Sequence, residues 1–246
     1  MSKYRNEYKV LRYDCNYKSN MKLEAMFEHM IDNAVNQNNF LMKDFSGDRD
    51  FYWIVYQWDV DILRYPKEGE KIFIDTYATG FYKFYAYRNF DIYDKDENLC
   101  LKAKSKWLML SKDFNLKRID EDVANLYDYE KGNEVLKRNF KDEDDDYKLS
   151  KTFDVRRSDI DSYMHVSNTK YINWLIESIP LDIYRNNKIE KIQITYKNQT
   201  KYNDSVGIYM SNIKTLDNKN IINYRIIGKT SKDTKAYGKI YIISNE

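Results

Sequence analysis

The pattern of apolar residues constrains the fold of this chain most, because it predicts one amphipathic helix followed by four strands, twice over. Residues 22–37 repeat apolar side chains three and four positions apart, which predicts one buried helix face made of Leu23, Met26, Phe27, Met30, Ile31, Ala34 and Val35. Asn20 is expected to cap this helix. The next segments alternate with period two and are rich in aromatic and β-branched residues, which predicts strands at 53–63, 71–78, 83–94 and 99–110.

The second half of the chain repeats this order. Residues 152–157 have the pattern of a strand and residues 168–178 that of an amphipathic helix. Four further segments alternate like strands: 192–198, 205–213, 222–230 and 235–244. A helix enclosed by an antiparallel sheet and duplicated in tandem describes an α+β chain of two hotdog folds.

The expected boundaries follow from this duplication. We expect an N-terminal hotdog at 1–130, a charged linker at 131–150 and a C-terminal hotdog at 151–246. The linker contains the sequence KDEDDDYK, at 141–148, which suits either a solvated connection or a docking surface.

Composition excludes several classes of protein. The formal net charge of +2 over 246 residues is too small to indicate nucleic acid as the main partner. Cys15 and Cys100 predict neither a disulfide framework nor a zinc site, so no metal is expected. The first residues lack the apolar core of a signal peptide, and no apolar run approaches the ~20 residues of a membrane span. These features predict a cytoplasmic globular protein.

The segment DVRRSDIDSYMHVSNTKYINW, at 154–174, carries the strongest candidate for chemistry. Asp161 and His165, one of two histidines in the chain, lie in a loop that leads directly into a predicted helix. A carboxylate or an imidazole can activate water or a nucleophile, and the free N–H groups of a helix N-terminus stabilise developing negative charge. The sequence leaves open which of the two residues serves as base or nucleophile.

These motifs resemble a known family. The second half resembles the Asp-x-x-x-His-Val-Asn-Asn-x-x-Tyr-x-x-Trp signature of the acyl-acyl-carrier-protein (acyl-ACP) thioesterases, and residues 53–94 and 101–119 resemble the first half of the same proteins. The resemblance implies hydrolysis of fatty acyl-ACP to free fatty acid and holo-ACP without a cofactor. It also implies an acyl-binding N-terminal hotdog and a catalytic C-terminal hotdog.

Two positions depart from the family pattern. Tyr163 replaces an Asn of the plant members, and Gln199 stands where relatives have a Glu. Gln orients water but accepts no proton, so Asp161 would have to supply the base. Asn168 is retained, either as part of the site or as a helix cap. In the first repeat, residues 13–23 lack the Asp/His pair and Tyr65 occupies the place of Gln199.

Binding residues are predicted on both halves. Met26, Phe27 and Met30 suit an acyl tunnel or plain core packing. Arg156, Arg157 and Lys170 suit the acidic carrier protein that delivers an acyl-phosphopantetheine arm. A tandem hotdog supplies its own pairing, so both a monomer and a homodimer are compatible with the sequence. The alternative function is a catalytically weak or silent acyl-thioester or lipid-binding protein; a hydratase is a third idea.

Overall fold

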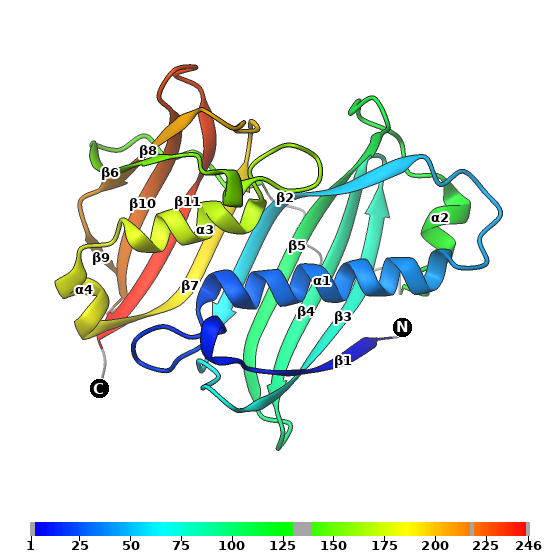
Figure 1. Ribbon diagram of the computed structural model, residues 1–246, viewed down its shortest axis with the longest axis horizontal. Helices are drawn as coiled ribbons and strands as arrows, with labels where there is room; N and C mark the ends of the chain where they lie inside the picture. Colours follow the sequence, from blue (N-terminus) through cyan, green and yellow to red (C-terminus); the bar gives the residue numbers. More distant parts are fainter. Residues whose placement is uncertain (1–2, 130–138, 217–218, 245–246) are drawn as a thin grey trace. The chain divides into compact units, whose positions relative to one another are not determined.

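The computed structural model describes residues 3–129, 139–216 and 219–244. The chain divides into two compact units, Met1–Arg138 and Asn139–Glu246. Each unit contains a helix that lies across one face of an antiparallel sheet (Figure 1). No helix within the described ranges is long and apolar enough to cross a membrane.

The first unit contains a 20-residue helix, α1 (Leu23–Met42), and five strands in the order β1-β3-β4-β5-β2. These strands are β1 (Tyr4–Lys9), β2 (Phe51–Ile62), β3 (Lys71–Tyr82), β4 (Tyr85–Asp94) and β5 (Leu99–Ser111). A short 3-10 turn, η1 (Arg12–Asp14), precedes α1, and a short helix, α2 (Glu121–Asn125), follows β5.

The second unit follows the same plan with a helix of 10 residues, α3 (Asn168–Glu177). Five of its strands lie in the order β7-β11-β10-β8-β6, and β9 pairs with β10. They are β6 (Tyr147–Asp154), β7 (Asn187–Tyr196), β8 (Ser205–Ser211), β9 (Lys214–Leu216), β10 (Lys219–Gly228) and β11 (Thr234–Ser244). The turn η2 (Arg157–Asp159) precedes α3, and the helix α4 (Leu181–Asn186) follows it.

The helix α1 is held against its sheet by apolar contact and by buried amide side chains, among them Asn33. The ring of Phe27 meets that of Trp58 edge-on at a centroid distance of 5.2 Å, and both side chains are fully buried. Asn33, also fully buried, donates from Nδ2 to the carbonyl oxygen of Ile74 at 2.9 Å. Burial of such aromatic side chains supplies most of the stability of an element of this kind, and the amide fixes the position of the helix along β3.

Several predicted limits were wrong. Asn20 does not cap α1, since the N-cap residue is Lys22, and the helix continues five residues beyond Gln37 to Met42. Val35 was expected on the buried face but is 46% exposed. The strand expected at 152–157 begins at Tyr147 and ends at Asp154, because residues 157–159 form the turn η2 instead.

The acidic segment after residue 138 belongs to the second unit. Asp142 pairs with Arg225 at 2.6 Å, Glu143 with Lys239 at 3.1 Å and Asp145 with Lys214 at 2.7 Å. These ion pairs attach residues 142–145 to β9, β10 and β11, in place of the solvated linker expected up to residue 150. Residues 130–138 of that expected linker lie outside the described residues.

Candidate active site

A tight turn centred on Asp161 forms the loop before α3. The Asp161 N–H donates to the carbonyl oxygen of His165 at 2.8 Å, and the Met164 N–H donates back to the Asp161 carbonyl oxygen at 3.1 Å. Met164 has a φ of +62°, which closes the turn. Asp161 Oδ1 accepts two backbone N–H groups, from Tyr163 at 2.9 Å and from His165 at 3.3 Å. Asp161 Oδ2 has no hydrogen bond to a described residue and is left for chemistry.

The turn presents its side chains unequally. His165 and Asp161 are half-buried, whereas Tyr163 is 43% exposed. Tyr163 contributes its backbone N–H to Asp161. The structure therefore brings Asp161 and His165 together on one five-residue turn, as the sequence predicted.

The start of α3 is fixed from both sides of the loop. The Val166 N–H donates to the carbonyl oxygen of Thr200 at 3.0 Å, and the Ser167 N–H to that of Asp159 at 2.9 Å. These bonds hold residues 166–167 extended, so the helix begins at Asn168 and Ser167 is its N-cap. The interpretation of Asn168 as the cap was wrong. The first turn of a helix leaves backbone N–H groups without intrahelical acceptors. In α3 the Lys170 N–H donates to the Ser167 carbonyl oxygen at 3.0 Å, and the helix itself begins three residues after His165.

Gln199 lies beside this loop, but its side chain faces solvent. Its neighbour Thr200 receives the Val166 N–H, which places the 199–200 segment alongside the loop. The Gln199 side chain is exposed and makes no hydrogen bond to a described residue, while its carbonyl oxygen accepts Lys235 Nζ at 3.0 Å.

The first unit contains the same turn with different side chains. Asn16 Oδ1 accepts the N–H groups of Lys18 at 2.9 Å and Asn20 at 3.3 Å, and Ser19 has a φ of +56°. The Met21 N–H donates to the carbonyl oxygen of Pro66 at 2.7 Å. Asn16 and Asn20 therefore occupy the places of Asp161 and His165. This match also supports the pairing of Tyr65 with Gln199, since each precedes the residue that accepts the bond.

Three polar side chains behind the loop were not predicted as site residues. Tyr196 donates its hydroxyl to the carbonyl oxygen of Asn168 at 3.0 Å, and Tyr171 donates to Thr200 Oγ1 at 2.8 Å. Burial raises the pKa of Tyr171 to about 12 and that of Tyr196 well above its usual value, so both remain neutral donors. Alternation along β7 indicated burial of this region, but no sequence signal located the hydroxyl partners.

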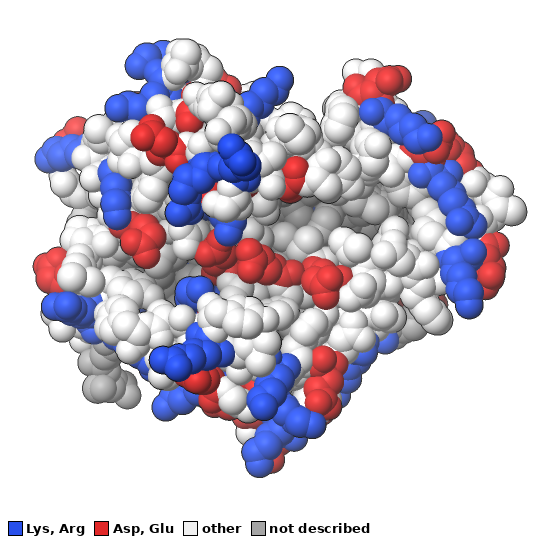
Figure 2. All heavy atoms as spheres, viewed as in Figure 1, with Lys and Arg blue, Asp and Glu red and all other residues white. Residues whose placement is uncertain are grey.

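The predicted basic residues differ in ion pairing and in exposure to solvent. Arg156 Nη2 pairs with Asp159 Oδ1 at 3.0 Å, and Asp159 is almost fully buried. Arg157 is exposed and makes no ion pair with a described residue, and Lys170 is half-buried in the first turn of α3. Lys and Arg side chains gather on the second unit over the region of η2 and the start of α3 (Figures 1 and 2).

The residues predicted to line an acyl tunnel lie in the core of the first unit. Met26, Phe27 and Met30 are each fully buried on α1. Their packing is established, and a lining role remains a prediction. Within residues 3–129, 139–216 and 219–244, no group of three or more His, Cys, Asp or Glu side chains is arranged to hold a metal ion.

A helix that crosses antiparallel strands and is preceded by the same turn occurs in both units, which defines a tandem hotdog protein. The family models agree with this architecture: the acyl-ACP thioesterase N-terminal domain matches residues 1–127 and the C-terminal domain matches residues 142–242. The chain belongs to the acyl-ACP thioesterase family.

The chain is similar to plant acyl carrier protein thioesterases. The chloroplast oleoyl-acyl carrier protein thioesterase of Coriandrum sativum is 28% identical over 167 residues, 63% of this chain and 45% of the relative. The chloroplast palmitoyl-acyl carrier protein thioesterase of Cuphea hookeriana is 26% identical over 222 residues, 80% of this chain and 51% of the relative. The chain thus spans about half the length of the curated relatives that it matches.

Solved structures show the same fold. A Lactobacillus plantarum protein provisionally described as an oleoyl thioesterase superposes with a TM-score of 0.85 at 21% identity, covering 100% of this chain and 97% of that one. The 12:0-ACP thioesterase of Umbellularia californica gives a TM-score of 0.78 at 16% identity, covering 99% and 94%. At these identities the likeness concerns the fold.

Proposed function

We propose that this chain hydrolyses fatty acyl thioesters carried on acyl carrier protein, releasing the free fatty acid and the carrier thiol. The Asp161 turn carries this proposal. Asn16 forms the same turn in the first unit with a neutral side chain, so the turn itself needs no charge. A carboxylate is retained in the unit that also has His165, where it leads into the first turn of α3.

The chemistry follows from these groups. The thioester carbonyl carbon is attacked, its oxygen becomes an oxyanion, and the first-turn N–H groups of α3 are suited to stabilise that charge. The C–S bond then breaks and the thiolate takes a proton. Asp161 either takes the proton of the attacking water or attacks the carbonyl carbon itself, and His165 polarises the carbonyl or shares the proton.

These two routes differ in which carboxyl group can receive the oxygen atom of water. If Asp161 attacks, water later opens an acyl–aspartyl anhydride and can leave its oxygen in the Asp161 carboxylate. After a single turnover in ¹⁸O-water, a labelled 157–170 peptide in mass spectrometry would establish attack by Asp161, because direct water attack leaves the peptide unlabelled.

The partner and setting are part of the proposal. The exposed guanidinium of Arg157, with Arg156 and Lys170 nearby in the sequence, would meet the acidic carrier protein, and the N-terminal hotdog with Met26, Phe27 and Met30 would receive the acyl chain. Cys15 and Cys100 are free thiols, which fits a reducing cytoplasm. Gln199 would then act through orientation, and Asn168 and Tyr163 through the loop backbone.

The test is Asp161→Asn, measured as thiol release from acyl-carrier-protein thioesters of short, medium and long acyl chains. Asn makes the same turn at position 16, so the variant is expected to fold normally while kcat falls at least ~100-fold, in the range for loss of a general base. Asp182→Asn, an exposed carboxylate in the first turn of α4, is the matched control and should retain activity. Full turnover by Asp161→Asn would remove Asp161 from the mechanism.

A silent acyl-binding protein is the second candidate, favoured by the exposed, uncharged Gln199. It predicts saturable binding of acyl-carrier thioesters without thiol release by the native chain. Turnover by the native protein excludes it.

A further inference from the structure

We infer that Tyr196 is a positioning residue, which together with Tyr171 and Thr200 holds the first turn of α3 in the orientation needed for thioester hydrolysis. This inference rests on the proposed function, because it concerns the same loop and helix N-terminus. These residues touch the backbone of the site, and no contact with substrate is assigned to them.

The contacts form a chain from the sheet to the helix start. Tyr196, the last residue of β7, donates its hydroxyl to the Asn168 carbonyl oxygen at 3.0 Å. Four residues further on, Thr200 accepts the Val166 N–H on its carbonyl oxygen at 3.0 Å and the Tyr171 hydroxyl on Oγ1 at 2.8 Å. The Tyr171 and Tyr196 rings meet edge-on at 5.6 Å. Val166, Asn168 and Tyr171, at the start of α3, are therefore each hydrogen-bonded to the segment 196–200.

The first unit shows that the fold does not require this arrangement. Its turn has the same backbone bonds, with Pro66 in the place of Thr200. Counting along the matched segments, Ile62 stands in the place of Tyr196 and Met26 in that of Tyr171. All three first-unit residues lack a side-chain hydrogen-bond donor. The same turn and helix therefore form with apolar side chains, and the polar set accompanies the unit that carries Asp161 and His165.

The physical role of the Tyr196 and Tyr171 hydroxyls is to fix the direction of the first-turn N–H groups of α3. The N–H groups of the first turn point along the helix axis, so a small rotation of α3 moves them away from a developing oxyanion. Misplacement of reacting groups by about 1 Å can cost about 100-fold in rate. The neutral hydroxyls of Tyr196, bonded to the Asn168 carbonyl oxygen, and of Tyr171, bonded to Thr200 Oγ1, restrain this rotation without adding a charge to the site.

The test is Tyr196→Phe, which removes one oxygen and keeps the ring. We expect kcat for acyl-carrier-protein thioesters to fall about tenfold or more, with KM changed less than about twofold. The reason is that the substrate contacts remain and only the orientation of the first-turn N–H donors of α3 is lost. Amide hydrogen exchange across residues 166–172 should become faster in this variant. The exchange readout needs no turnover, so it tests the positioning role even if the native chain proves inactive.

Tyr224→Phe is the matched control. Tyr224 is a fully buried tyrosine of the same unit that donates to the Gln193 carbonyl oxygen at 2.8 Å, away from the loop backbone. It should lose similar stability but keep kcat and the exchange rates of residues 166–172. A Tyr196→Phe variant with native kcat and native exchange in this segment would overturn the inference, as would equal losses of kcat in the two variants. A native chain without turnover, but with faster exchange in Tyr196→Phe alone, would reject the proposed function and retain the positioning role.

Discussion

At the scale of single residues, the two repeats separate structure from chemistry. Asn16 and Asp161 each accept two backbone N–H groups at nearly equal distances, 2.9 and 3.3 Å in both cases. An amide oxygen and a carboxylate oxygen serve equally well in this role. The charge of Asp161 is therefore the feature that the turn does not explain.

Lys106 is a second residue whose chemistry is set by its surroundings. Its side chain is 2% exposed on β5 and lies among the rings of Tyr56, Tyr85 and Tyr87, with Nζ 5.4–6.0 Å from their centroids. Burial lowers the pKa of Lys106 to about 8. An ammonium group in this position gains cation–π contact but loses hydration.

We expect Lys106 to make stability rise with pH. Between about pH 8 and about pH 10.4 the folded chain holds a neutral amine while the unfolded chain is protonated, so the unfolded state binds more protons. From pH 7 to about pH 9.5 the free energy of unfolding of the native chain should rise by about 1–2 kcal/mol relative to Lys106→Met. Urea unfolding at several pH values measures this. Lys102→Met, an exposed lysine on the same strand, should leave the pH dependence unchanged, and parallel native and Lys106→Met curves would contradict the prediction.

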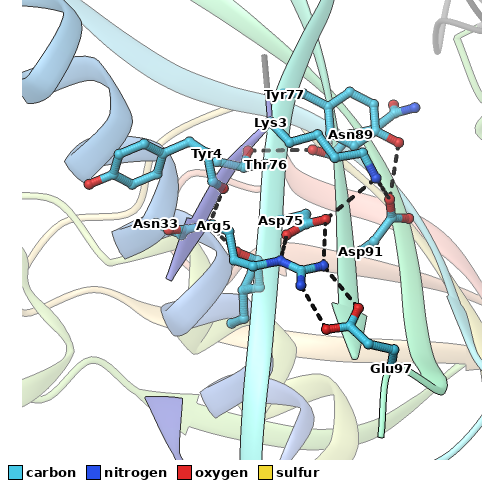
Figure 3. A network of polar contacts seen from close by, with 11 residues as sticks. Lys3, Tyr4, Arg5, Asn33, Asp75, Thr76, Tyr77, Asn89, Asp91 and Glu97 are labelled. Atoms are coloured by element: carbon cyan, nitrogen blue, oxygen red, sulfur yellow. Dashed lines mark hydrogen bonds and ion pairs between the residues drawn. The ribbon is translucent and has the colours of Figure 1, made fainter. Parts of the chain in front are cut away.

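At the scale of elements, the edge strand β1 is attached by ion pairs to the buried carboxylates of Asp75 and Asp91. β1 pairs with β3 at one end of the strand order of the first unit. Arg5 Nε lies 2.6 Å from Asp75 Oδ1 on β3 and Arg5 Nη1 lies 2.7 Å from Glu97 Oε1, while Lys3 reaches both Asp75 and Asp91 (Figure 3). The Asp75 side chain is only 3% exposed. The buried Asp75 carboxylate therefore pairs with Arg5 on β1 and with Lys3, the residue before β1.

Arg5→Ala should destabilise the chain by about 2–3 kcal/mol, because it leaves the buried Asp75 carboxylate with a weaker partner. Lys71→Ala provides the comparison, since Lys71 joins the same two strands through an exposed pair with Glu7 at 2.8 Å. Loss of that exposed pair should cost less than about 1 kcal/mol. Urea unfolding at pH 7 compares the two variants, and equal losses would show that the burial of Asp75 does not matter.

At the scale of the whole molecule, one fold is used twice with different side chains. The first unit has a helix of 20 residues and carries Ile62, Pro66 and Met26 where the second unit carries Tyr196, Thr200 and Tyr171. The second unit has a helix of 10 residues preceded by the Asp161 turn. The formal net charge of +2 is small. Attraction of an acidic carrier would therefore depend on local basic residues near η2 rather than on the field of the entire chain.

Arg157→Glu should raise KM for acyl-carrier-protein substrate about fivefold at low salt while kcat stays near its native value, because charge at the rim of an interface mainly governs encounter. The effect should shrink as salt is added. An acyl-pantetheine substrate without the carrier should show no change. Lys188→Glu, at the opposite end of β7 from Tyr196, is the matched control, and equal KM values for the two variants would exclude docking at Arg157.

Sequence patterns predicted the order of the main helices and strands, the α+β duplication and the placement of Asp161 and His165 on one loop. These features depend on the periodicity of apolar residues and on spacings within a few positions, which local geometry enforces. The acidic segment 142–145 showed the limit of this reasoning, because a run of carboxylates looks solvated until its basic partners are located.

Tertiary structure alone decided the features that join distant positions. The Tyr196–Asn168 bond spans 28 residues, the Tyr171–Thr200 bond 29 and the Arg5–Asp75 pair 70. The sequence aligned residues 13–23 with the Asp161 loop, but only the structure showed that Asn16 accepts the same two backbone bonds as Asp161. Periodicity predicts which face of an element is buried, but hydrogen-bond partners depend on strand register and on close packing between elements. The Asp161 carboxylate was thus predictable from the sequence, whereas the hydroxyl contacts that we infer orient the first turn of α3 depend on the fold.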